Sequence, residues 1–158
     1  MKVIKVGMAD FKIARSGEIL TSIGLGSCVA IVLYDEKMRL GGLGHIMLPE
    51  RSLARDKSNP AKFADSCTDL MLRVLKRKGS KNIKAKLFGG ANMFPSVKAN
   101  HLMNIGNRNS AAAKKILKMC SIPIVASDLG GNCGRTVTFT IDTGQVEVKS
   151  IGKLEKVF

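Results

Sequence analysis

The sequence is poor in several residue types on which common chemistries depend. It has no tryptophan and one tyrosine among 158 residues, which disfavours an aromatic platform for single-stranded nucleic acid. Its four cysteines form no CxxC pair, and it has only two histidines, His45 and His101. These counts and spacings argue against a zinc cluster.

Long hydrophobic runs are also missing. The longest uncharged stretch, residues 19–34, has 16 residues and is interrupted by Gly24 and Gly26. A membrane-spanning helix needs about 20 residues, so this stretch is too short. Charges recur within residues 1–15, which is not the pattern of a secretory signal peptide. We therefore expect a cytoplasmic protein with reduced thiols.

Acidic residues are scarce compared with basic ones. The 12 Asp and Glu residues face 26 Lys and Arg residues, and the formal net charge is +14. This excess predicts an acidic partner, which could be nucleic acid, an anionic membrane or an acidic protein surface. Hydrophobic residues make up 45% of the chain, as in globular proteins. The length predicts a single domain over residues 1–158.

Hydrophobic periodicity and turn residues predict the order of the elements. Helices are expected at 60–78, after the helix-start signal Asn59-Pro60, and at 109–120. Strands are expected at 18–22, 28–34, 38–48, 83–88 and 122–126, followed by a hairpin of 135–141 with 145–150. Strands at both ends with helices between them favour an α+β layered fold.

The hairpin around residues 36–37 has the most informative geometry. A two-residue turn there places Cys28 directly opposite His45. Opposed residues share one face of a sheet, with Cβ atoms about 4.5–5.5 Å apart. The imidazole could then assist formation of the thiolate, which is the reactive form of cysteine. The alternative is that Cys28 merely opens a buried strand and that His45 is a hydrogen-bonded core histidine.

Small residues precede both members of this pair. Gly26 and Ser27 come just before Cys28, where backbone N–H groups could bind an oxyanion. A glycine-rich stretch, 41–44, comes just before His45 and is expected to leave the facing strand unobstructed.

The remaining cysteines and the second histidine are expected to have no catalytic role. Cys67 and Cys120 lie on the apolar faces of the two predicted helices, where a free cysteine usually packs as a small hydrophobe. Cys133 is expected on a loop without a histidine near it in the sequence, and His101 in a solvated polar stretch.

Several short motifs follow one another along the chain. They are Gly24-Leu25-Gly26-Ser27-Cys28-Val29, Gly44-His45-Ile46-Met47-Leu48-Pro49, Lys62-Phe63-Ala64-Asp65, Phe88-Gly89-Gly90-Ala91-Asn92-Met93-Phe94, Asn104-Ile105-Gly106-Asn107-Arg108-Asn109, Asp128-Leu129-Gly130-Gly131-Asn132 with Gly134-Arg135, and Thr143-Gly144. In this order, and over about residues 3–157, the chain closely resembles the CheD family of chemoreceptor glutamine deamidases.

The resemblance implies a fold and an activity. The fold would be a layered β-sandwich flanked by helices, like the cysteine hydrolase domain of the cytotoxic necrotizing factor toxins. The activity would be that of a cysteine-dependent protein-glutamine glutaminase. Such an enzyme converts selected glutamines of chemoreceptor cytoplasmic helices to glutamates, with release of ammonia, during chemotaxis adaptation.

The resemblance also implies the site residues. The family uses a cysteine, a histidine and a threonine six residues before the cysteine. The first two fall on Cys28 and His45, and the third falls on Ser22, a departure from the family pattern. Serine keeps the hydroxyl but lacks the methyl group that restricts the threonine rotamer. Thr21 is adjacent, but on a strand it would face the opposite way.

The implied partners are proteins. The substrate would be the cytoplasmic domain of a chemoreceptor, and the membrane would be approached only through receptors. No metal and no organic cofactor is implied. CheC, a phosphatase of the response regulator CheY, is a further implied partner. An alternative function is therefore a regulatory module that binds CheC and stimulates its phosphatase activity. A third hypothesis, nucleic-acid binding, rests on the net charge alone.

Overall fold

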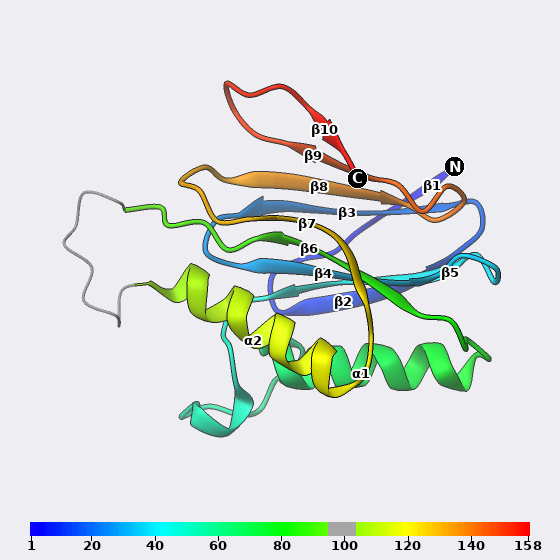
Figure 1. The fold of residues 1–158 in the computed structure, drawn as a ribbon, viewed down its shortest axis with the longest axis horizontal. Helices are drawn as coiled ribbons and strands as arrows, with labels where there is room; N and C mark the ends of the chain where they lie inside the picture. The colour runs from blue at the N-terminus through cyan, green and yellow to red at the C-terminus, as the bar shows by residue number, and fades with distance from the viewer. Residues whose placement is uncertain (95–103) are drawn as a thin grey trace.

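Two β-sheets lie face to face, and two α-helices cover the outer side of one of them (Figure 1). This computed structural model describes residues 1–94 and 104–158. One sheet, named the β3 sheet here, contains in spatial order β1 (Lys2–Lys5), β3 (Glu18–Leu25), β8 (Arg135–Thr140), β9 (Val146–Lys149) and β10 (Lys156–Val157). The other, named the β4 sheet, contains β2 (Asp10–Arg15), β5 (Leu40–Ile46), β4 (Val29–Asp35), β6 (Lys84–Gly89) and β7 (Ile124–Leu129).

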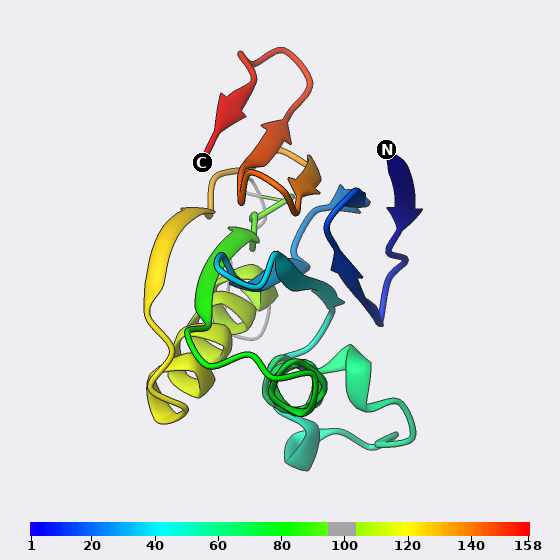
Figure 2. The same ribbon diagram turned by 90° about the vertical axis from the view of Figure 1, so that its right-hand side faces the viewer.

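The β4 sheet is the middle layer, as the view along the strands shows (Figure 2). Strand β4 is buried on both faces. Alternate residues starting at Val29 pack against the helices, and those starting at Ala30 face the β3 sheet. A strand covered on both sides needs apolar residues throughout, which explains why the run 28–34 is continuously hydrophobic.

The α+β class with sheets layered against helices, predicted from the sequence, is confirmed. The predicted C-terminal hairpin is also confirmed, as β8 paired with β9. Strands β1 and β2 are absent from the prediction. Both are exposed or half-buried along most of their length, so their hydrophobic pattern is weak.

The helices are confirmed, but both start elsewhere than predicted. Pro60 opens a 3-10 turn, η2 (Pro60–Lys62), and α1 (Ala64–Arg77) starts only after the extended and fully buried Phe63. Helix α2 (Ile105–Met119) begins before residue 109, capped by the side chain of Asn104. A second 3-10 turn, η1 (Arg51–Leu53), lies between β5 and η2. Within the described ranges, no helix has the length and apolar character of a membrane span.

The predicted register of the central hairpin is wrong by two residues. Asp35 pairs with Leu40, so four residues, 36–39, connect the strands instead of two. The carboxylate of Asp35 accepts the N–H of Met38 at 3.2 Å, which closes this wider turn. His45 consequently lies opposite Ala30. A shift of two residues preserves the face of each side chain, so the residue at position 28 lies on the same face as His45, in a diagonal position.

Candidate active site

Three polar side chains from different elements lie in the layer between the two sheets. Ser22 is on β3, His45 is on β5, and Cys28 directly precedes β4. His45 is fully buried, Ser22 is 1% exposed and Cys28 is 9% exposed. Two of these groups are therefore buried among apolar residues, and the thiol lies nearest to solvent.

Ser22 faces inward because side chains alternate along β3. Its neighbour Thr21 lies on the other face, where its hydroxyl bonds the Val137 carbonyl and the Thr138 hydroxyl, each at 3.2 Å. Inward-facing Ser22 has its Oγ 2.8 Å from His45 Nδ1. The structure thus brings Ser22, and not Thr21, to the histidine.

The hydrogen bonds of Ser22 determine the tautomer of His45. A hydroxyl has one hydrogen, and Ser22 donates it to the carbonyl of Val6 at 2.8 Å. Its oxygen must then accept the hydrogen of His45 Nδ1. In a neutral imidazole with Nδ1 protonated, Nε2 carries the lone pair. Nε2 is buried and has no hydrogen-bond partner among the described residues, so it can accept a proton.

Cys28 and His45 are near neighbours without a hydrogen bond between them. In the observed register the thiol lies diagonally across from the imidazole, where Cβ atoms are about 7–8 Å apart or somewhat less. The expectation of directly opposed residues is therefore corrected to a diagonal pair on one face. The reason is the four-residue turn, which displaces every pair of this ladder by two residues.

Both groups are uncharged at neutral pH. Burial raises the pKa of the Cys28 thiol, an effect that a hydrogen bond to its own backbone opposes. Burial also lowers the pKa of His45. Both shifts disfavour the charged forms, because a charge loses its hydration when it is buried. The resting pair is consequently a thiol and a neutral imidazole.

The turn that presents Cys28 is held by its carbonyl groups. The Cys28 carbonyl accepts the N–H of Gly90 at 2.8 Å, and the Gly26 carbonyl accepts the N–H of Ala91 at 2.9 Å. The N–H groups of Gly26 and Ser27 have no hydrogen-bond acceptor among residues 1–94 and 104–158. They are thus available to bind an anionic oxygen.

The glycine pair at the end of β6 is explained by this turn. Gly89 has a φ of +109°, and a Cβ on it would overlap the Cys28 carbonyl oxygen. Gly90 has a φ of +64°, and a Cβ there would overlap the hydroxyl of Ser110 on α2. Glycine alone accommodates both constraints, which lets the end of β6 pack between the Cys28 turn and α2.

The glycines of stretch 41–44 serve packing. A Cβ on Gly41 would lie 2.8 Å from the ring of Phe139, and one on Gly44 would lie 2.7 Å from Cys67 Sγ. These glycines therefore let the β3 sheet and helix α1 approach β5 closely. The expectation that they keep the facing strand unobstructed is replaced by this packing role.

One polar residue of this region was not predicted from the sequence. Asn109 on α2 is fully buried, and its Nδ2 donates to the carbonyls of Ser27 and Met47, both at 3.0 Å. A signal for it exists, because Asn109 lies on the helix face that also carries Ala112 and Ala113. A polar residue within an apolar stripe calls for a hydrogen-bonding explanation.

The other cysteines lie outside this group. Cys67 lies on the buried face of α1, as predicted, and burial raises the pKa of its thiol to about 12. Cys120 is half-buried and packs at the edge of the helix core. Cys133 lies on the loop before β8, as predicted. The predicted solvated histidine, His101, lies outside the described residues.

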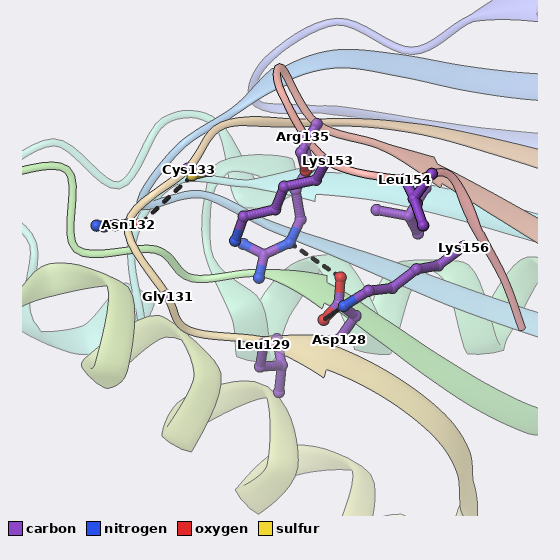
Figure 3. A pocket seen from close by; sticks show the side chains of 11 residues that line it. Asp128, Leu129, Gly131, Asn132, Cys133, Arg135, Lys153, Leu154 and Lys156 are labelled. Carbon is purple, nitrogen blue, oxygen red and sulfur yellow. Dashed lines mark hydrogen bonds and ion pairs between the residues drawn. The ribbon is translucent and has the colours of Figure 1, made fainter.

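A separate cavity of about 180 Å³ opens between β7, β8 and the segment that leads to β10 (Figure 3). Its charged residues are largely paired with one another. Arg135 donates to Asp128 at 3.2 Å and to the Gly130 carbonyl at 2.8 Å, and Lys156 lies 3.7 Å from Asp128. Cys28, His45 and Ser22 do not line this cavity, so it is distinct from the site between the sheets.

The fold and the site together define a class: an α+β sandwich domain that holds a thiol, a neutral imidazole and a hydroxyl between its sheets. Comparison with known proteins adds the family. A family model described as CheD chemotactic sensory transduction matches residues 47–150.

Similar proteins span nearly the whole chain. The chain is 49% identical to a protein of Clostridium kluyveri, over 96% of this chain and 95% of that one. It is 49% identical to one of Caldanaerobacter subterraneus subsp. tengcongensis, over 96% and 94%. It is 46% identical to one of Syntrophomonas wolfei, over 99% and 98%. Each relative is named "Probable chemoreceptor glutamine deamidase CheD". The chain belongs to the CheD family, which confirms the resemblance noted in the sequence.

Proposed function

We propose that this protein is a chemoreceptor glutamine deamidase, which converts selected glutamine side chains of receptor cytoplasmic helices to glutamates and releases ammonia. The relatives carry this activity in their names. The observation that carries the proposal for this chain is the unprotonated Nε2 of His45, which has no hydrogen-bond partner in the described part of the chain and lies on the same sheet face as Cys28.

In the first half of the reaction, His45 Nε2 takes the proton of the Cys28 thiol. The thiolate attacks the carboxamide carbon of the substrate glutamine, and the N–H groups of Gly26 and Ser27 stabilise the oxyanion that forms. The imidazolium then gives its Nε2 proton to the departing nitrogen. Ammonia leaves, and a thioester joins the substrate to Cys28.

In the second half of the reaction, water hydrolyses the thioester. His45 Nε2 takes a proton from the water as its oxygen attacks the thioester carbon. The Cys28 sulfur leaves and regains a proton from the imidazolium, so the products are glutamate and the original thiol. Throughout, Ser22 accepts the hydrogen bond of His45 Nδ1 and keeps the ring oriented, the role that the third member has in other triads.

The thiol approaches the imidazole in this mechanism only after a local change. The pKa of the thiol is raised and that of His45 is lowered, so transfer of the proton from Cys28 to His45 is unfavourable unless the thiolate is consumed as it forms. Attack on the carboxamide carbon of the bound substrate consumes it. Turnover would thus be coupled to binding of the receptor, while a small reagent would still react slowly with the 9% exposed thiol, assisted by His45.

We further propose that the two packed sheets and their helices form the cysteine hydrolase fold of the cytotoxic necrotizing factor toxins. The two five-stranded sheets with both helices on one outer face support this assignment. The whole chain would act as one domain in the cytoplasm, where receptor signalling helices lie. Its net charge of +14 favours association with an acidic receptor bundle.

The decisive experiment uses a receptor cytoplasmic fragment that still carries its glutamines. Incubation with the protein is expected to convert particular glutamines to glutamates, seen by peptide mass spectrometry, with an equal amount of ammonia. Cys28→Ala is expected to show neither product. Cys133→Ala, which removes a half-buried thiol from a loop outside the group, is the matched control and is expected to retain full activity. An unmodified receptor, or an active Cys28→Ala variant, overturns the proposal.

Binding of CheC stays a prediction of the family resemblance. A regulatory role separate from catalysis would survive in Cys28→Ala, which would still bind CheC and raise its phosphatase activity. Failure of the unmodified protein to form a complex with CheC would remove this second role.

A further inference from the structure

The amide of Asn109 joins two backbone segments that are far apart in the sequence. It bonds the carbonyl of Ser27 and the carbonyl of Met47, each at 3.0 Å. Carbonyl oxygens only accept hydrogen bonds, so the amide nitrogen must face both of them and both of its hydrogens are used. One side chain of α2 thus ties the residue before Cys28 to the strand end that carries His45.

This bridge begins where the strand ladder stops. The pairing of β4 with β5 ends at Val29 opposite Ile46. Beyond that pair the two segments bond to different neighbours. The Met47 N–H donates to the carbonyl of Lys62 at 2.8 Å, and the Cys28 carbonyl accepts from Gly90. At this level Asn109 supplies the direct hydrogen-bonded link between the thiol segment and the imidazole segment.

Asn109 lacks the properties expected of a residue that serves only the stability of the fold. It is fully buried, and its Oδ1 has no hydrogen-bond partner among the described residues, which carries a desolvation cost. Asparagine is also a weak helix former compared with the alanines that share its face, Ala112 and Ala113. A buried polar group retained at a cost indicates a requirement that an apolar residue would not meet.

We propose that Asn109 is a positioning residue, which fixes the Cys28 turn relative to His45 through its two carbonyl bonds. The proposal rests on the proposed deamidase function and adds a residue to its site. Among the described residues, the amide of Asn109 bonds the two flanking carbonyls and neither Cys28 nor His45, so it acts on the separation of these two groups. A misplacement of about 1 Å between reacting groups can reduce a rate by about 100-fold. Asn109→Ala is therefore expected to lower kcat by about 10- to 100-fold and to change KM by less than about twofold.

The test measures the reactivity of the Cys28 thiol without any receptor. Iodoacetamide labels the folded protein, and mass spectrometry follows each cysteine peptide separately. Cys67 is fully buried, so its labelling reports unfolding in the same sample. Asn107→Ala is the matched control, because Asn107 is the same residue type, lies on the same helix and has an exposed side chain.

Four proteins form a cycle: the unmodified chain, Asn109→Ala, His45→Ala and the double variant. With His45 present, Asn109→Ala is expected to slow Cys28 labelling about tenfold, because the base no longer meets the thiol. With His45→Ala, removal of the Asn109 amide is expected to change the rate by less than about twofold. A purely structural role would change labelling by the same factor in both backgrounds, so the coupling separates the two roles. Asn109→Ser serves as a second variant.

Equal factors in both backgrounds, or an effect of Asn107→Ala as large as that of Asn109→Ala, would overturn the proposal. So would labelling of Cys67 as fast as Cys28 in both Asn109 variants, which would make Asn109 a residue of fold stability. The coupling does not depend on a receptor. An unmodified receptor together with strong coupling would therefore refute the proposed function and leave the positioning role intact. Receptor deamidation without coupling would do the reverse.

Discussion

Two buried basic residues lie in the same inter-sheet layer and differ in how completely they are hydrogen-bonded. Lys86 on β6 faces this layer beside Val32, and His45 on β5 faces it beside Ala30. Lys86 Nζ donates to the carbonyls of Gly144 and Phe158 at 2.8 and 3.0 Å.

The ammonium of Lys86 also lies 5.3 Å from the centre of the Tyr34 ring, a favourable cation–π contact. His45 has one nitrogen bonded to Ser22, and the other has no hydrogen-bond partner within residues 1–94 and 104–158. A buried group whose partners are all provided by the protein contributes to stability, whereas one with an open position retains the capacity to react. This difference supports the proposed role of His45 in the chemistry and a role of Lys86 in the fold.

The largest expected effect on turnover comes from substitution of His45. His45→Ala removes the proton acceptor of both half-reactions, so turnover is expected to fall by at least about 10³-fold. The melting temperature is also expected to fall, because the substitution of a fully buried side chain leaves a cavity, so turnover is compared at a temperature where the variant is folded. Ammonia release and differential scanning calorimetry measure the two quantities. Residual activity above a tenth of the original would contradict the role of His45 as base.

A smaller loss of turnover is expected when Ser22, which orients the His45 ring, is substituted. Ser22→Ala deletes the acceptor of the Nδ1 hydrogen, so the imidazole loses its fixed tautomer and orientation, and kcat is expected to fall about 10- to 100-fold. Ser22→Thr keeps the hydroxyl and adds the methyl that restricts its rotamer, and is expected to retain full activity. Steady-state kinetics on the receptor fragment compare both. Equal, mild losses for Ser22→Ala and His45→Ala would refute the division of roles.

The pH dependence follows from the buried state of His45. Burial lowers its pKa from the ordinary 6.5, so the neutral base persists to more acidic solution. The acid limb of kcat/KM is therefore expected below pH 6.5. The unfolded chain binds this proton first, so the free energy of unfolding should also fall as the pH drops below 6.5. In His45→Ala this component of the stability change should vanish. An acid limb centred above 6.5 would contradict the assignment.

The smallest expected effect on turnover belongs to Lys86. Lys86→Met leaves two carbonyl groups without their donor and should lower the free energy of unfolding by about 1–3 kcal/mol. Turnover at a temperature where the variant is folded should stay unchanged. Lys84→Met, at the half-buried start of the same strand, is the matched control and should change stability by less than about 0.5 kcal/mol. A loss of turnover in Lys86→Met comparable to that in Ser22→Ala would contradict the role of Lys86 in stability alone.

Much of the fold was predictable because its signals are local. The uninterrupted apolar run of β4 and the amphipathic stripes of α1 and α2 each determine one element. The register of the β4–β5 hairpin could not be predicted by counting residues from an assumed two-residue turn. It depends on one side chain, Asp35, whose carboxylate caps the turn through Met38 and also accepts N–H groups of Lys81 and Asn82. Those last two bonds join segments that the pattern of a single hairpin does not connect.

For the site, the sequence by itself determined the chemical groups: one thiol in a glycine-rich turn, one imidazole on the following strand, and a hydroxyl six residues before the thiol. The family resemblance selected Ser22, and alternation along a strand predicted that Thr21 would face the opposite way. Only the tertiary structure decided the protonation pattern and the link between the segments. The tautomer of His45 depends on the carbonyl of Val6, which directly follows β1, and the bridge of Asn109 spans 82 residues to Ser27. Residue types and periodicity are local properties of a chain, whereas hydrogen bonds between distant segments exist only once packing has brought their atoms within about 3 Å.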